Sequence, residues 1–299
     1  MSKSTDAATL YRALRDGLLR SVLKKSRAHT EANSASCAIS QNGNRYMGAK
    51  IESDTHLLDV GSEHVALLSA VQHLDFHIQE VVTLVDGDSA SVSPLTLKVL
   101  ADFGARTGRV PAYRVLNRSG RTVFHARNAA KEISFYRPSL RVFAVLPKTP
   151  KKNWHDLSAS EMPKTILKTY ASRGLGLAFP TYAGASSYGA AVVTTSKRIY
   201  FAGQYSAPDK RLGLHAEMSA IIAALMAGEK GITHLGLVSD KFEGKPCTLC
   251  GCCRQFIAEL SEKFGWKVAI HCFAKSTTAH RVYTIDSLLP YAWSSKKWQ

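Results

Sequence analysis

Hydrophobic and polar residues recur along the chain with two different periods, and these periods predict its helices and strands. Leu10, Leu14, Leu18 and Val22 are spaced every four residues among lysines and arginines, which predicts an amphipathic helix over residues 7–27. Similar apolar patterns predict further helices at 62–73, 94–104, 163–172, from about 214, and after 250. Short apolar runs bounded by turn residues predict strands at 36–40, 45–51, 81–85, 112–116, 121–125, 140–146, 189–194, 199–202, 235–238 and 268–273.

The predicted elements occur in the same order twice. Each half of the chain reads helix, β-hairpin, helix, strand, helix, strand, as expected for an internal duplication. Residues 147–153 combine two prolines with three lysines and lack apolar periodicity, which is typical of a linker. We therefore expect an α/β protein with two domains, at 1–146 and 161–299, joined by a linker at 147–160.

Composition and charge narrow the classes of partner. The chain has 299 residues, of which 45% are hydrophobic, so it can bury substantial cores. Its formal net charge of +16 favours anionic partners such as nucleotides or nucleic acid, and residues 104–152 contribute most of that charge. The longest uncharged stretch, 174–196, contains Pro180 and many glycines and serines. We therefore expect no membrane span.

The cysteines favour a reducing compartment. Four of the six lie between Cys247 and Cys253, a clustering that indicates a metal or catalytic use rather than a disulfide framework. With no signal-peptide pattern, a cytoplasmic protein is expected. The basic helix at 7–27 leaves an organellar targeting segment as an alternative, although Asp6 and Asp16 argue against it.

Two motifs indicate zinc chemistry. His215-Ala216-Glu217 opens an apolar helix, and a cysteine cluster that includes Cys250 and Cys253 follows about thirty residues later. A His-x-Glu with a Pro-Cys-x-x-Cys is the signature of zinc deaminases that act on nucleobases. One histidine and two cysteines provide three ligands for Zn²⁺ and leave a fourth position for water. Glu217 is then placed to accept and return the proton of that water.

Two other interpretations of these motifs remain. The first is a structural zinc site with four cysteine ligands, which would leave His215 and Glu217 without a role. Its ligands would be Cys247, Cys250, Cys252 and Cys253. The second is a non-catalytic binding protein that keeps its zinc, but such a protein would gain nothing from Glu217 beside the metal.

Longer motifs resemble a known family, the cytidine deaminases, especially their two-domain bacterial type. The resemblance covers residues 160–293 well. It implies a mixed five-stranded sheet with helices on both faces, a zinc cofactor, a homodimer, and a role in pyrimidine salvage. The implied reaction is hydrolysis of cytidine or deoxycytidine to uridine or deoxyuridine with release of ammonia, and the Ala216 backbone is expected beside the base. The matching motifs are His215-Ala-Glu-x-Ser-Ala-Ile221, Gly228-Glu-Lys230, Cys250-Gly-x-Cys-Arg-Gln-Phe256 and Leu288-Leu-Pro-Tyr-Ala-Trp293.

Two Cys-x-x-Cys registers fit the family pattern. The pair Cys247 and Cys250 keeps the family's preceding proline, whereas Cys250 and Cys253 keep every position after the first cysteine. We expect Cys250 and Cys253 to be the ligands, because that register matches more positions. Cys247 is then a neighbour or an alternative ligand, and Arg254 is expected to donate a hydrogen bond to a thiolate.

The first half resembles the same family more faintly and lacks the ligands. Gly61 occupies the histidine position, Glu63 matches the acid, and no cysteine follows Pro94. We therefore expect a degenerate, metal-free copy of the deaminase domain in which Glu63 has no water to activate.

The sugar-binding positions of the family are altered. Gln204 and Ser206 stand where the family has the Asn-x-Glu pair that binds ribose hydroxyls, and Ser186 stands where a phenylalanine packs on the nucleoside. We expect Gln204 and Ser206 to contact the substrate. Loss of the carboxylate removes a charge-assisted hydrogen bond and also removes repulsion of a phosphate. A phosphorylated or modified cytosine nucleotide, or cytosine in RNA or single-stranded DNA, is therefore the alternative substrate.

The basic region of the first half is the candidate contact for nucleic acid. Arg118, Arg121 and Arg127 could bind phosphates, with Tyr113 and Phe124 among them for stacking. The other interpretation is a solvated basic face whose aromatic residues belong to the core, since aromatic residues on strands usually pack inward.

Overall fold

The computed structural model describes residues 2–23, 32–55, 58–88, 92–133, 154–157, 163–182 and 184–294. The chain divides into two compact units. The first consists of Met1–Val71 and Asp75–Val142, and the second of Gln72–Leu74 and Phe143–Gln299. The predicted strand at 140–146 lies outside the described residues.

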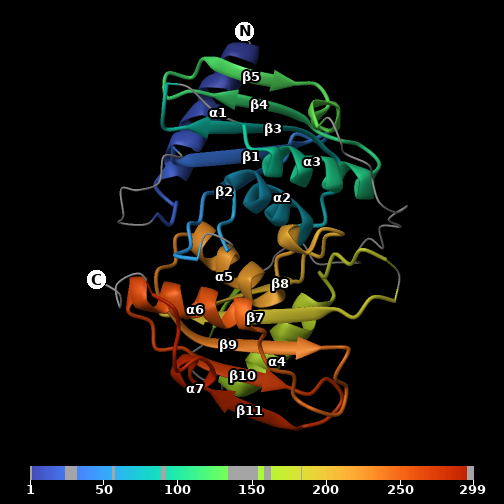
Figure 1. Ribbon diagram of the computed structural model, residues 1–299, viewed down its shortest axis with the longest axis vertical. Helices are drawn as coiled ribbons and strands as arrows, with labels where there is room; N and C mark the ends of the chain where they lie inside the picture. The colour runs from blue at the N-terminus through green and yellow to red at the C-terminus, as the bar shows by residue number, and fades with distance from the viewer. Residues whose placement is uncertain are drawn as a thin grey trace. The chain divides into compact units, whose positions relative to one another are not determined.

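The first unit is a five-stranded mixed sheet with helices on both faces (Figure 1). The strand order is β2-β1-β3-β4-β5; β3 and β4 are parallel, and the other neighbours are antiparallel. Helix α1 packs Leu10 and Leu14 against Cys37, Val82 and Leu84 of the sheet. The elements are α1 (Ser2–Leu18), β1 (Ser34–Ser40), β2 (Arg45–Ala49), α2 (Ser62–Gln72), β3 (Ile78–Val85), α3 (Pro94–Thr107), β4 (Ala112–Leu116), β5 (Thr122–Ala126) and the 3₁₀ turn η1 (Ala129–Glu132).

The second unit repeats this arrangement with one additional strand. Its strand order is β11-β10-β9-β7-β8-β6, in which β9 and β10 are parallel. Helix α4 packs Leu167 and Tyr170 on one face of the sheet, and Figure 1 shows α5 and α6 on the other. The elements are β6 (Trp154–Asp156), α4 (Pro163–Leu175), β7 (Tyr188–Thr194), β8 (Arg198–Gly203), the 3₁₀ turn η2 (Lys210–Leu212), α5 (Ala216–Met226), β9 (Ile232–Ser239), α6 (Gly251–Phe264), β10 (Ala269–Phe273), β11 (His280–Tyr283) and α7 (Ile285–Leu288).

The duplication predicted from the element order is visible in the topology. The sequence α, β-hairpin, α, β, α, β, β occurs in both units, and the strand order β2-β1-β3-β4-β5 matches β8-β7-β9-β10-β11. In both units the pairing of the second and third strands of this order, β1 with β3 and β7 with β9, carries a bulge, at Ile39/Ser40 and at Val193/Thr194. The mixed α/β fold expected from the sequence is therefore confirmed.

A glycine allows α4 to lie directly on the central strand of the second sheet. A Cβ at Gly189 of β7 would lie only 2.0 Å from the backbone nitrogen of Leu175 and 2.2 Å from the carbonyl oxygen of Ala171. Such distances are far inside van der Waals contact, so only glycine permits this approach. The close packing fixes β7 at the centre of the sheet, on whose other face the site lies.

The structure differs from the prediction in three features: the end of the first helix, a strand in the expected linker, and the number of strands in the second sheet. The helix predicted at 7–27 ends at Leu18, and Val22 instead pairs with Ile51 in an isolated bridge. Strand β6 lies within the range expected to be a linker, where it pairs with β8 at the edge of the sheet. The sheet of the second unit therefore has six strands rather than the five expected.

In the first unit Glu63 is bonded to its neighbours rather than left without partners. It lies in the first turn of α2, is buried, and accepts hydrogen bonds at Oε1 from Tyr113 Oη (2.6 Å) and Thr83 Oγ1 (3.0 Å). Thr83 continues the network through Ser36 to Ser62, with both oxygen pairs 2.7 Å apart. The position that matches the catalytic acid is therefore part of a closed polar network in the core of the first unit.

We expect Tyr113→Phe to destabilise the first unit by about 1–3 kcal/mol, the usual cost of removing one partner of a buried hydrogen bond. The change removes the hydroxyl that reaches Glu63 and keeps the ring, whose centroid lies 5.8 Å from that of Phe124. Urea unfolding of the variant measures the change in the free energy of unfolding. Phe124→Leu, which alters the ring contact and leaves the Glu63 bonds intact, is the control. Equal stability of Tyr113→Phe and the wild type would contradict this account.

Candidate metal centre

Two helix N-termini place the predicted ligands. His215 is the residue before α5, where it has extended backbone angles and its side chain makes no capping hydrogen bond to the helix. Cys250 occupies the same position before α6, and Cys253 lies in the first turn of that helix. The positive ends of the two helix dipoles therefore meet at the cysteine sulfurs, which stabilises thiolates.

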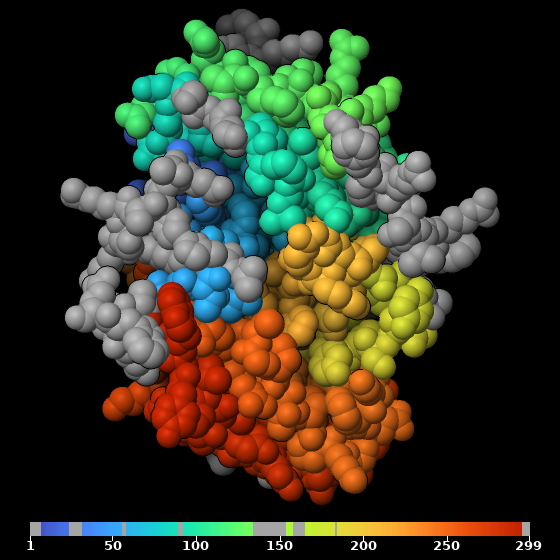
Figure 2. Space-filling model, viewed as in Figure 1, coloured from blue at the N-terminus to red at the C-terminus, as the bar shows by residue number. Residues whose placement is uncertain are grey.

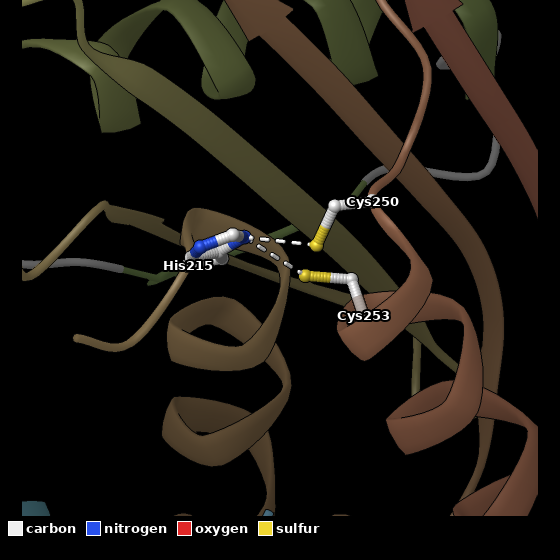
Figure 3. A group of neighbouring side chains, drawn as sticks. All are labelled: His215, Cys250 and Cys253. Carbon is white, nitrogen blue, oxygen red and sulfur yellow. Dashed lines mark hydrogen bonds between the residues drawn. The ribbon is translucent and has the colours of Figure 1, made fainter. Parts of the chain in front are cut away.

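The three side chains point toward one another (Figure 3). The Nδ1 atom of His215 lies 3.2 Å from Sγ of Cys250 and 3.4 Å from Sγ of Cys253. One ligand atom from each residue lies within 4.8 Å of the others, and the described part of the chain contains no second group of His, Cys, Asp or Glu with this arrangement. One imidazole and two thiols converging in this way fit Zn²⁺, which prefers nitrogen and sulfur ligands.

Electrostatics favour a thiolate at Cys250. A hydrogen bond from Cys253, followed by one from His215, lowers the pKa of Cys250 to about 3. Cys253 is the proton donor of this pair, so its own pKa is raised well above the ordinary value, and burial raises it further. These hydrogen bonds therefore favour the negative charge at Cys250 that a cation would require.

Glu217 lies beside the predicted ligands. It is in the first turn of α5, is only 3% exposed, and makes a side-chain hydrogen bond with Cys253. Burial raises the pKa of Glu217, and the charge of Cys250 adds to the increase. A carboxyl group whose pKa lies nearer to neutrality is suited to accept and return protons.

The two possible cysteine registers differ in which sulfur lies beside His215. Cys250 and Cys253 form a group with His215, whereas Cys247 is buried and is not part of that group. Burial raises the pKa of Cys247 to about 12, and the pKa of Cys253 is raised as well, so only the grouping of the side chains distinguishes these two thiols. Cys252 is exposed in the first turn of α6 and makes a side-chain hydrogen bond with Cys250, but it is not part of that group. A four-cysteine structural site is therefore not formed by the described residues.

The expectation for Arg254 is wrong. Its Nε donates to the carbonyl oxygen of Leu249 (2.9 Å) and its Nη1 to that of Leu288 (3.0 Å), rather than to a thiolate. The spacing of Arg254 from Cys253 could not predict this direction, because Leu288 follows thirty-four residues later.

The expected substrate positions lie around β7 and β8. Gln204 follows β8 directly, and its Oε1 is buried without a hydrogen-bond partner. Ser206 lies two residues further on and donates its backbone N–H to the carbonyl oxygen of Phe179. Ala216 is the first residue of α5, between His215 and Glu217, and is fully buried. Ser186 is exposed.

One residue near the site was not predicted. Tyr188 begins β7 and forms a side-chain hydrogen bond with Ser239 at the end of β9. Burial raises the pKa of Tyr188, and the charges of Cys247 and Glu217 raise it further, so the phenol lies near both. The alternation of β7 was the available signal, because it places Tyr188 on the same face as Ala190 and Val192, opposite the face that α4 covers.

The expected nucleic-acid contacts are exposed on the first unit. Arg118, Arg121 and Arg127 are all accessible to solvent. Arg118 also lies 3.9 Å from Asp86 and 3.7 Å from Asp88, so part of its charge is balanced locally. Tyr113 is buried, as expected for an aromatic residue of the core.

The fold and the site together define a zinc-binding α/β unit with a buried acid beside the metal ligands. Residues 180–265 match the family model described as the cytidine and deoxycytidylate deaminase zinc-binding region. The matched range contains His215, Glu217, Cys250 and Cys253. The resemblance deduced from the motifs is therefore confirmed for the second unit.

Solved structures of cytidine deaminases are also similar to this chain. The enzyme from Burkholderia pseudomallei is 25% identical, with a TM-score of 0.40, and the match covers 44% of this chain and 100% of that one. The enzyme from Mycobacterium tuberculosis is 23% identical, with a TM-score of 0.36, and the match covers 45% of this chain and 99% of that one. No curated protein sequence matches the chain. No helix of the described residues has the length and hydrophobicity needed to cross a membrane.

Proposed function

We propose that the second unit is a zinc-dependent hydrolase that deaminates cytidine or deoxycytidine to uridine or deoxyuridine and releases ammonia. The observation that carries this proposal is the buried carboxyl of Glu217 beside the converging side chains of His215, Cys250 and Cys253. A structural zinc site has no use for such an acid. The match of residues 180–265 to the deaminase zinc-binding region supports the same reaction class.

In this mechanism His215, Cys250 and Cys253 hold the zinc ion. Bound zinc supplies Lewis acidity that makes a water molecule reactive near neutral pH. Glu217 takes one proton from the water that attacks C4 of the cytosine ring and gives it to the ring nitrogen N3. It then takes the second proton from the hydroxyl group formed on C4 and gives it to the departing amine, so that the C4–N bond breaks, the carbonyl forms and ammonia leaves. Because burial raises the pKa of Glu217, the same carboxyl group can both accept a proton and return it at one pH.

The substrate contacts are proposed from the residues around this centre. The unpartnered Oε1 of Gln204 is a buried acceptor, and a sugar hydroxyl is the donor that would satisfy it. Ser206 offers a hydroxyl that can donate or accept, and the backbone of Ala216 lies between the metal ligand and the acid. These groups carry no charge, so they select a sugar by hydrogen bonding alone.

A direct competition tests the substrate class. Zinc-loaded protein is offered cytidine, deoxycytidine, CMP and cytosine-containing single-stranded RNA and DNA together, and mass spectrometry follows the loss of each amino group. Conversion of the free nucleosides alone supports the proposal and a role in pyrimidine salvage. Conversion of CMP or the oligonucleotides while nucleosides persist would replace it with a phosphate-recognising deaminase. Absence of any reaction by protein that retains zinc would reject a deaminase of these substrates.

Nucleic acid is the second candidate substrate, favoured by the exposure of Arg118, Arg121 and Arg127. If these guanidiniums bind phosphates of a single strand, replacing all three with glutamine should reduce the slope of log Kd against log salt by about 2, at ~0.7 per contact. Fluorescence anisotropy of labelled single-stranded RNA between 50 and 200 mM salt measures this slope. Arg173→Gln with Arg281→Gln, which changes charge on the second unit, is the control. An unchanged slope would assign the three arginines to a solvated surface.

A further inference from the structure

Two neighbouring side chains of α6 connect the residues just before this helix, Leu249 and Cys250 (the Cys250 loop), to the segment 284–294 that follows β11. Arg254 and Gln255 come directly after Cys253. Arg254 uses two different nitrogens for two carbonyl oxygens, Nε for Leu249 (2.9 Å) and Nη1 for Leu288 (3.0 Å). A planar guanidinium holds both acceptors in one fixed geometry, so the positions of the two backbone segments depend on each other.

The bond to Leu249 acts on the orientation of Cys250. The carbonyl oxygen of Leu249 belongs to the peptide group whose nitrogen is that of Cys250, so Arg254 fixes the plane from which the Cys250 side chain leaves the backbone. Cys250 is itself exposed and has no capping bond from its side chain. Its direction toward His215 depends on the backbone that carries it, together with the hydrogen bonds to His215 and Cys253.

The segment 284–294 is attached to α6 by polar bonds. The side chain of Gln255 makes two hydrogen bonds with the backbone of Trp293. Its Nε2 donates to the carbonyl oxygen of Trp293 (2.7 Å), and its Oε1 accepts from the backbone N–H of Trp293 (3.2 Å). Ser294 Oγ donates to Oε2 of Glu262 (3.0 Å). Of the large side chains of the segment, Tyr291 is 93% exposed and Trp293 is 44% exposed, whereas Ile285, Leu288 and Leu289 are half-buried.

A groove separates part of this segment from the helix. It has a volume of about 610 Å³ and lies between Ala258 and Ser261 of α6 and Ile285 and Leu289 of the segment. On the face shown in Figure 2, the surface of the segment, in red, lies next to that of α6, in orange. The segment therefore borders this groove without filling it, and hydrogen bonds to Arg254, Gln255 and Glu262 attach it to α6.

We propose that the segment 284–294 holds the Cys250 loop in its metal-binding geometry through Arg254, which is a positioning residue. When the segment is docked, Leu288 fixes the guanidinium and the guanidinium fixes Leu249. When the segment leaves, Nη1 loses its acceptor and the constraint on the Leu249 peptide weakens. This inference rests on the metal site of the proposed function. By thermodynamic linkage, zinc binding must favour docking of the segment by the same factor as docking favours zinc.

The first test measures zinc release. Arg254→Lys keeps the charge but cannot serve both carbonyls with a planar fork, so we expect zinc transfer to a chromogenic chelator to become about 10- to 100-fold faster, as for other groups that orient metal ligands. Arg281→Lys, an exposed arginine on β11, is the matched control and should release zinc at the wild-type rate. In cobalt-loaded protein, the thiolate absorption band should shift in Arg254→Lys and remain unchanged in the control.

A second variant separates the segment from local effects. Gln255→Met removes both bonds to Trp293 and leaves the bond from Arg254 to Leu249 in place. We expect it also to accelerate zinc release, because the segment is loosened. Wild-type release rates in Gln255→Met would overturn the proposal, even if Arg254→Lys were too unstable to measure.

Hydrogen exchange tests the reciprocal effect. Removal of zinc from the wild type should accelerate amide exchange in residues 288–294, and this response should be smaller in Arg254→Lys. Exchange that is insensitive to zinc would overturn the coupling. A wild type that binds no zinc would instead reject the proposed function, so the two failures are distinguishable.

Discussion

Glu217→Gln is expected to bind one zinc ion and to deaminate cytidine about 10²- to 10⁴-fold more slowly than the wild type, the usual contribution of a general acid or base. The amide has the size of the carboxyl group but cannot accept the proton of the attacking water. The measurement is kcat by steady-state release of ammonia, together with zinc content by metal analysis. Glu217 lies beside the ligands without being one of the three grouped side chains, so zinc should remain.

The control for this variant is Glu243→Gln, which changes an exposed carboxyl of the same unit outside the group of metal ligands. Its kcat and zinc content should match those of the wild type. If Glu217→Gln turned over at a near-normal rate, another group would have to move the proton. Loss of zinc from Glu217→Gln would instead assign the residue to the metal site itself.

The fold could be predicted well where the apolar period was long. Residues 94–104 and 62–73 were expected to be helices, and α3 and α2 cover those ranges to within a few residues. Strand β6, by contrast, is only three residues long and pairs at a sheet edge, so it has no period to detect. The helix at 7–27 was overextended because Val22 continues the four-residue spacing, while the backbone there pairs with Ile51.

The candidate site could be predicted in its residue types but not in all its contacts. His215, Glu217 and the cysteines were found from spacing, since both ligand motifs lie at the starts of helices. The contacts of Arg254 join residues far apart in the sequence, and no local pattern carries that information. Ser36, Thr83 and Tyr113 around Glu63 come from three separate strands, so their network was equally hidden.

The register of the cysteine ligands gives the second large effect. Cys250→Ser and Cys253→Ser should each weaken zinc binding by more than the 10- to 100-fold that follows loss of a supporting group, because a direct ligand is removed. Both sulfurs lie within 3.4 Å of the imidazole nitrogen of His215, so neither has a substitute in the same geometry. Deaminase activity should fall with zinc occupancy. The measurement is zinc content after equilibration against a chelator of known affinity.

Cys247→Ser and Cys252→Ser are the matched controls, and both should keep zinc. Cys247 is buried and lies outside the group formed by His215, Cys250 and Cys253. Cys252 is exposed on the first turn of α6, outside the group of converging ligands. Loss of zinc from Cys247→Ser together with retention by Cys253→Ser would shift the register by three residues. The helix start at Cys250 would then have to rotate, because its first turn now directs Cys253 toward His215.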